Sequence, residues 1–158
     1  MMKKLFGLLL IATSLTGFTA CDDDDDKMVE IAGTYLGEMN TKVTVMGAEV
    51  PVKQSDVEAT ITKEGDTYTV TIKSFTYNDY NYGNIVVSGV TMEDEDSFIG
   101  QGECALTKND VSYTAAIEDL EGEKSGKNVT IEFDMKLPVS PKMTILFDVT
   151  YTGSENQK

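Results

Sequence analysis

The sequence predicts an all-β protein, specifically an eight-stranded antiparallel up-and-down barrel, with a two-sheet β-sandwich as the alternative. Three observations support this fold class. Apolar and polar residues alternate with period two over several segments, the pattern of strands that bury one face. After Lys27, no stretch keeps an apolar face at helical spacing for three turns. Short clusters of turn residues separate the alternating segments, as in sheets built from hairpins.

The alternation is clearest in Val129–Leu137 and Met143–Tyr151, where the odd-numbered residues are all apolar. Such segments place one set of side chains in the interior and the other in water. Pro138 and Pro141 are expected in the turn between them, where a missing N–H is harmless. The bulky residues expected on the buried faces of the barrel are Tyr68, Val70, Ile72, Ile131, Phe133, Met135, Met143, Ile145 and Phe147.

The remaining segments follow the same rule more loosely and are separated by turn residues, such as Asn109-Asp110 and the Gly65 turn, that predict tight hairpins. A short helical turn at Glu118–Glu123 is the one expected exception, and Gly122 argues against it. The eight expected strands are Gly33–Val45, Val50–Lys63, Asp66–Phe75, Asn84–Val90, Ser97–Leu106, Val111–Ile117, Lys127–Leu137 and Lys142–Thr152.

A barrel is favoured over a sandwich for two reasons. Closure removes exposed strand edges, which otherwise promote aggregation. Gly33 and Gly37 in the first strand supply the small residues that a sharply coiled strand uses at close approach.

The N-terminus has the features of a secretory signal. Lys3 and Lys4 precede an apolar run, Leu5–Leu15, and small residues follow it. The run is too short for a membrane span, which needs about 20 apolar residues. We therefore expect residues 1–20 to be a signal peptide, residues 21–28 a lipidated cysteine with an acidic tether, and residues 29–158 the folded domain.

The segment Phe18-Thr19-Ala20-Cys21 resembles a bacterial lipobox. The resemblance implies cleavage before Cys21 and acylation of this residue with palmitate-type chains, so that the membrane becomes a partner through a lipid anchor. Several chains hold a protein on a membrane where one does not, because each buried CH₂ contributes about 0.8 kcal/mol. Asp22–Asp26 is a self-repelling, solvated tether. This run also resembles the acidic export signal of some surface lipoproteins, which implies outer-membrane surface display, with a periplasm-facing leaflet as the alternative.

Composition excludes several functions. The chain has 27 acidic residues and 13 basic ones, and it contains no arginine, histidine or tryptophan. A basic patch for nucleic acid is therefore not expected, and anionic substrates would be repelled. Histidine-based catalysis and histidine-ligated metal sites are excluded. The sequence predicts a non-enzymatic protein without a cofactor.

Ile31-Ala32-Gly33-Thr34-Tyr35-Leu36-Gly37 is similar to the opening G-x-Y-x-G strand of lipocalin-like, or calycin-like, bacterial lipoproteins. The segments Lys73–Tyr77 and Asn84–Val90 resemble the third and fourth strands of that family. The resemblance covers most of Ala32–Tyr151 and implies an eight-stranded antiparallel barrel. It implies no activity and identifies no binding residue.

The most aromatic segment, Phe75–Gly83, is the candidate contact site. Tyr77, Tyr80 and Tyr82 would suit a small neutral or apolar ligand, or a surface protein, if they lie at the mouth of the barrel. The alternative is that these tyrosines cap the barrel core. If the interior is filled, a structural or protein-interaction lipoprotein without a small-molecule ligand remains.

Two further features are expected to be structural. Cys104 falls on the same face as Phe98 and Leu106, so it is expected in the core, as a small hydrophobic residue. Met92–Asp96 gathers four carboxylates but lacks the spacing of a calcium loop, so it is expected to be a solvated turn.

Overall fold

A computed structural model of the chain describes residues 28–156, and the predicted closed barrel is confirmed. The sandwich alternative is wrong, because β1 hydrogen-bonds to both β2 and β10 and leaves no edge. The expected signal segment and Cys21 lie outside the described residues. The strands are β1 (Gly33–Val45), β2 (Ala48–Glu64), β3 (Thr67–Ile72), β4 (Thr76–Tyr77), β5 (Tyr80–Asn81), β6 (Ile85–Met92), β7 (Ser97–Lys108), β8 (Val111–Ser125), β9 (Asn128–Ser140) and β10 (Met143–Glu155).

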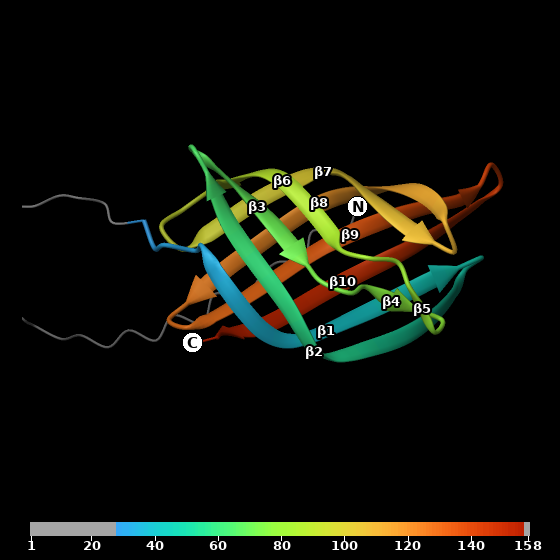
Figure 1. The fold of residues 1–158 in the computed structure, drawn as a ribbon, viewed down its shortest axis with the longest axis horizontal. Helices are drawn as coiled ribbons and strands as arrows, with labels where there is room; N and C mark the ends of the chain where they lie inside the picture. Colours follow the sequence, from blue (N-terminus) through green and yellow to red (C-terminus); the bar gives the residue numbers. More distant parts are fainter. Residues whose placement is uncertain (1–27, 157–158) are drawn as a thin grey trace, which may run out of the picture.

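The eight long strands form an antiparallel meander in the order β1-β2-β3-β6-β7-β8-β9-β10 (Figure 1). The last strand closes on the first in continuous register, from Tyr35 opposite Glu155 to Thr44 opposite Leu146. Closure thus rests on the pairing of residues that are far apart in sequence.

Tight turns form where the sequence predicted them. Asn109 and Asp110 both have positive φ (49° and 64°), as a two-residue type I′ hairpin requires. Gly65 also has a positive φ, in the turn between β2 and β3. Short polar residues and glycine tolerate this backbone region, which explains why the turns could be located from sequence.

The helical turn predicted at Glu118–Glu123 is wrong, because β8 continues through it to Ser125. The irregularity is a bulge. The register against β9 shifts between Glu118 and Glu121, and Asp119 adopts a φ of 49°. An extra residue in one strand breaks the alternation without ending the strand, so the sequence pattern is lost while the pairing resumes.

Two further departures from expectation concern the end of the third strand and the place of Pro138. The third strand stops at Ile72, because the chain leaves the barrel and forms the β4–β5 hairpin before returning as β6. Pro138 lies inside β9, opposite Thr144, where the register shifts beside Met143. A bulge tolerates proline because local ladder hydrogen bonding is already interrupted.

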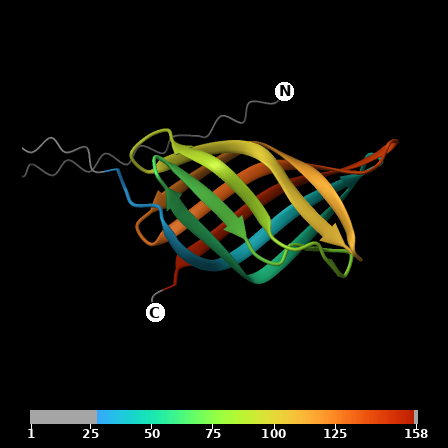
Figure 2. The same ribbon diagram turned by 45° about the horizontal axis from the view of Figure 1, so that its top comes forward.

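The meander gives the barrel two different ends, which Figures 1 and 2 both show. The proximal end receives the chain at residues 28–32 and carries the turns β2–β3, β6–β7 and β8–β9. The distal end carries the turns β1–β2, β7–β8 and β9–β10, together with the β3–β6 insertion, residues 73–84. Within residues 28–156, no helix has the length and apolar character to cross a bilayer.

Bulky apolar side chains from every barrel strand occupy the interior, including eight of the nine predicted residues. Cys104 is buried with Phe98 and Leu106, as predicted. The burial predicted for Met143 is wrong. Its side chain is 38% exposed, because it lies at the distal tip beyond the closed part of the barrel and next to a register shift.

Candidate functional site

The insertion between β3 and β6 carries all three predicted contact tyrosines to the distal end of the barrel (Figure 1). Asn78 and Asp79 have positive φ and turn the chain between Tyr77 and Tyr80, which face each other in register. The base of the insertion is closed by two backbone hydrogen bonds. Phe75 N donates to Gly83 O at 2.7 Å, and Tyr82 N donates to Phe75 O at 2.8 Å.

Polar contacts attach the insertion to both sides of the mouth. On the β2 side, the Gln54 amide donates to Ser74 O (3.1 Å) and its oxygen accepts from Thr76 N (3.0 Å). On the β7 side, Thr107 N donates to Tyr82 O at 2.9 Å. The insertion is therefore fastened to two strands that are not neighbours in the barrel.

Aromatic stacking seals the mouth beneath the insertion. Phe75 is 1% exposed, and the centre of its ring lies 5.3 Å from the ring centre of Phe147 in β10, in an edge-to-face arrangement. The ring of Tyr77 packs against the same Phe147 ring, with 5.5 Å between the ring centres. The ring centres of Tyr82 and Phe75 are 5.8 Å apart. Such pairs stabilise by about 0.5–1.5 kcal/mol beyond their burial. These rings fill the position where a ligand would enter an open barrel.

The three predicted tyrosines consequently have different environments. Tyr82 is buried, Tyr77 is half-buried and Tyr80 is exposed. Lys108, at the end of β7, places its Nζ 3.8 Å from the centre of the Tyr80 ring, a cation–π contact. Sequence reasoning missed Lys108, because its nearness to the insertion follows only from the closed topology. Tyr80 and Lys108 form the accessible part of the predicted site.

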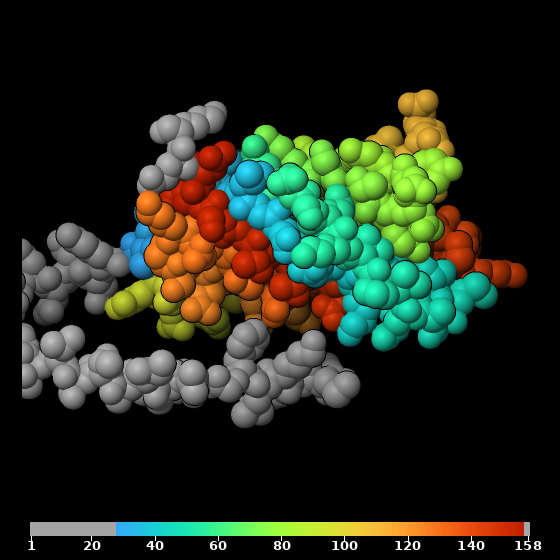
Figure 3. Space-filling model, turned by 90° about the horizontal axis from the view of Figure 1, so that it is seen from below, coloured from blue at the N-terminus to red at the C-terminus, as the bar shows by residue number. Residues whose placement is uncertain are grey.

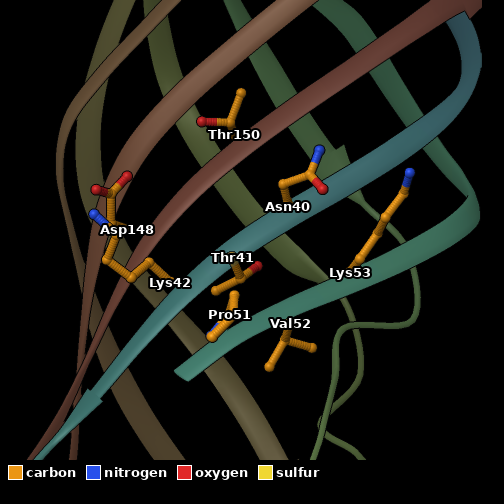
Figure 4. Close-up of a pocket in the computed structure, with 8 residues that line it drawn as sticks. All are labelled: Asn40, Thr41, Lys42, Pro51, Val52, Lys53, Asp148 and Thr150. Carbon is orange, nitrogen blue, oxygen red and sulfur yellow. The ribbon is translucent and has the colours of Figure 1, made fainter. Parts of the chain in front are cut away.

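Among the hollows formed by residues 28–156 are three that open to solvent, with volumes of about 550, 470 and 250 Å³. The largest is an open groove across β10, β1 and β2 (Figure 4). Its walls carry amine and amide donors from Lys42, Lys53 and Asn40, and a carboxylate acceptor from Asp148. Lys53 also pairs with Glu38 at 3.0 Å, so one donor of the groove is already engaged.

A row of carboxylates crosses β8, β9 and β10 on the outer face. Asp134 stands in register between Glu118 and Asp148. Partial burial, followed by the charges of Asp148, Asp119 and Glu118, raises the pKa of Asp134 above its usual range. Lys136 offsets part of this repulsion and donates to Glu118 at 2.6 Å. Among residues 28–156, no group of three or more potential ligands is placed to hold a metal ion.

The proximal end contains a buried lysine that the sequence pattern did not identify. Lys124 is 8% exposed and its Nζ donates to Glu30 O at 2.8 Å, with the Glu155 carboxylate 3.8 Å away. Tyr35 donates to Ile31 O at 2.7 Å, and burial, followed by the charges of Glu155 and Glu30, raises its pKa to about 12. These contacts hold the entering chain across the base of the barrel.

The structure describes only one of the two cysteines, Cys104. Cys21 lies outside the described residues, so its lipidation remains a prediction. Cys104 is buried, and burial raises the pKa of its thiol. A thiol with a raised pKa is a poor nucleophile, which fits the core role assigned from sequence.

Comparison with known proteins shows a match to the family model of the calycin-like beta-barrel domain over residues 31–154. No curated protein matches the chain. Among solved structures, the fold resembles the crystal structure of a putative outer membrane protein from Bacteroides fragilis NCTC 9343, with a TM-score of 0.54 and 24% identity. The match covers 79% of this chain and 51% of that one, so this chain spans about half the length of the other protein.

The family match covers all eight barrel strands except the last residue of β10. The structural likeness is of the fold alone, and it agrees with the closed antiparallel meander described above. The chain belongs to the calycin-like beta-barrel domain family.

Proposed function

We propose that the protein is a non-enzymatic, lipid-anchored component of the outer membrane that binds a surface protein through its distal end. Cys21 would carry the acyl chains, and Asp22–Asp26 would separate the barrel from the lipid. One structural relationship supports the proposal most strongly. The chain enters the barrel at the proximal end, whereas Tyr80 and Lys108 lie at the distal end (Figure 1). An anchor at Cys21 would therefore leave the tyrosine site accessible.

A protein partner fits this end better than a small ligand inside the barrel. Phe75, Tyr77 and Tyr82 occupy the mouth, and bulky side chains occupy the interior. Among the described residues, no buried side-chain nitrogen or oxygen lacks a hydrogen-bond partner. An interior built for a polar ligand normally leaves such groups to be satisfied by the ligand. Recognition would then use the exposed ring of Tyr80, a residue type enriched in protein interfaces.

The lipobox resemblance at Phe18–Cys21 supports the envelope location, and the Bacteroides fragilis protein with a similar fold is itself described as a putative outer membrane protein. Replacing Cys21 by serine tests the anchor. We expect the variant to leave the membrane fraction and enter the soluble one. Protease treatment of intact cells then distinguishes display on the surface from the periplasm-facing leaflet.

Photo-crosslinking tests the binding site. A benzophenone amino acid at position 80 should give an adduct with a discrete protein in intact cells. The same group at Thr62, an exposed position near the proximal end, serves as the control. Identical adducts at both positions, or none at position 80, would contradict a partner site at the distal end.

A further inference from the structure

The wall of the barrel is unevenly paired, and its weakest seam lies between β6 and β7. Within residues 28–156, these strands share only two register pairs, both beside the turn at the proximal end. The pairs are Thr91–Ile99 and Met92–Phe98. In contrast, β1 pairs with β10 along ten consecutive residues, and Figure 3 shows the surface of β1, in blue and cyan, beside that of β10, in red. We call the facing segments Ile85–Val90 and Gly100–Leu106 the unpaired seam.

Backbone irregularities in both strands explain why the pairing is lost. Gly89 in β6 has a φ of 74°, and the register of β6 against β3 shifts between Val87 and Val90. In β7, the register against β8 shifts between Gly100 and Gly102. Such irregularities bend a strand and turn its N–H and C=O groups out of line with the neighbouring strand. Because both lie next to the last regular pair, the β6–β7 ladder does not resume beyond them.

Side-chain packing closes the unpaired seam in place of a backbone ladder. Val87 and Val90 of β6 and Leu106 of β7 are all buried. At the distal end, the hydrogen bond from Thr107 N to Tyr82 O holds the two sides together. Packing of this kind is not directional, so it resists separation of the strands less specifically than a ladder of hydrogen bonds does.

Solvent reaches the outer side of the unpaired seam. The hollow of about 470 Å³ is lined by residues of β6, β7 and β8, including Gly89 and Gly100. A Cβ on Gly102 would meet no atom within 4 Å, so the outer side of β7 is also uncovered here. Water can therefore bind the backbone groups of this region as soon as the strands separate.

Cys104 lies at the unpaired seam and is 4% exposed. Burial raises the pKa of its thiol, and the backbone of Val86 in β6 offsets part of this rise. The thiol therefore lies against β6, across the part of the seam that has no ladder. A thiol reagent reaches it when β6 moves away from β7 or when the whole barrel unfolds.

We propose that the barrel opens laterally between β6 and β7, as a gate in its wall, while the other seams stay closed. Opening breaks the two register pairs and the Thr107–Tyr82 hydrogen bond, whereas opening of the β1–β10 seam breaks a continuous ladder. Proteins open locally where few hydrogen bonds hold a segment. The open gate presents β6 and β7 as strand edges, the elements to which extended segments of other chains add. It is independent of Cys21 and Tyr80, so its failure leaves the proposed function intact.

The first test uses the full chain with Cys21→Ser, in which Cys104 is the only cysteine. Iodoacetamide is added at several urea concentrations below the unfolding transition, and alkylation is followed by mass spectrometry. Local opening exposes little surface, so the rate at Cys104 should be nearly independent of urea.

The matched control is Cys104→Ala/Val149→Cys in the same background. Position 149 is buried in β10 and is paired on both sides. Its alkylation should require global unfolding, so the rate should rise steeply with urea and be at least about tenfold lower than that of Cys104 without urea.

Two engineered disulfides separate opening of the gate from global unfolding. T91C/I99C joins exposed residues that face each other across the gate, and L36C/S154C does the same across the β1–β10 seam. Both cross-links constrain the unfolded chain, but only the first one crosses the gate. Oxidised T91C/I99C should be alkylated at Cys104 about tenfold more slowly than T91S/I99S, whereas oxidised L36C/S154C should match Leu36→Ser.

Three results would overturn the proposal. The first is an alkylation rate at Cys104 that is no faster than global unfolding allows, or that rises with urea as steeply as unfolding followed by circular dichroism. The second is equal slowing by the two disulfides, and the third is no slowing by T91C/I99C. The urea series keeps Cys104 and the core unmodified, so it decides the question even if a cross-linked variant does not fold.

Discussion

The hydroxyl of Tyr151, in the last strand, donates to the backbone carbonyl of Tyr35, in the first strand, at 3.0 Å. It also lies 3.2 Å from the Val57 carbonyl of β2. A single buried phenol thus links β10 to both β1 and β2 at the seam where the barrel closes. Tyr35 and Tyr151 are 116 residues apart in sequence. Burial raises the pKa of Tyr151, like that of Tyr35, from 10.0 to about 12.

These tyrosines predict alkaline destabilisation. Each folded pKa exceeds the unfolded value of 10.0, so the folded state retains its proton more strongly. The contribution of these two tyrosines to the free energy of unfolding is complete below pH 10, and it is lost as the pH rises through about 12. Urea unfolding followed by circular dichroism across this range should show a falling midpoint. Tyr151→Phe should lower stability by about 1 kcal/mol at neutral pH and flatten the alkaline decline. Parallel alkaline curves for both proteins would contradict this role.

Close approach of β1 and β10 predicts a severe effect at Gly37. A Cβ on this residue would lie 2.0 Å from Thr152 O, and the backbone of the paired strand cannot move without opening the seam. We expect Gly37→Ala to destabilise by about 3 kcal/mol. Gly102→Ala is the matched control, because a Cβ there meets no atom within 4 Å and should change stability by no more than about 0.5 kcal/mol. Similar melting temperatures for the two variants would show that the seam is more adaptable than this geometry implies.

The alternation in Val129–Leu137 could be predicted from sequence because β9 lies between two long partners and remains regular. The pattern misled at Met143, since a strand end that extends beyond the closed barrel keeps its alternation but loses its interior. At Glu118–Glu123 the alternation is lost although the strand continues, because Asp119 adopts a left-handed backbone conformation. The continuation of the strand is evident only from its pairing with β9, which resumes at Glu121.

The candidate site was predictable only in part. An aromatic loop between strands was evident from Phe75–Gly83, but the different burial of Tyr80 and Tyr82 depends on how the insertion folds over Phe147. Lys108 approaches Tyr80 because β7 ends beside the insertion, a relationship between segments that no local pattern encodes. Contacts across a closed barrel therefore required the structure.

Lys124 provides a test of the proximal end. Lys124→Met keeps an apolar stem of similar length but removes the hydrogen bond from Nζ to Glu30 O, which holds residues 28–32 across the base. Loss of one charge-assisted hydrogen bond should cost about 2 kcal/mol, measured as the change in free energy of unfolding. Lys127→Met, at an exposed position in the adjacent turn, is the control and should have little effect. Equal unfolding midpoints would mean that the entering segment is held without Lys124.

The row of carboxylates predicts a stabilising substitution. Asp134 faces Glu118 on one side and Asp148 on the other, and like charges opposite one another in a sheet repel. Because its folded pKa is raised, the folded state binds the proton more strongly than the unfolded chain does, and stability falls as the pH rises above the ordinary value of 3.8. Asp134→Asn removes this repulsion, so the variant should be more stable than the unmodified protein at neutral pH, by about 0.2–1 kcal/mol. Once the carboxyl of Asp134 is protonated in acid, the variant should show no advantage in stability.

Urea midpoints at acidic and neutral pH measure the difference. Glu103→Gln is the control, because it makes the same change in charge elsewhere on the outer face. A gain that persists unchanged in acid, or one that Glu103→Gln reproduces, would show that repulsion within the row is not its source.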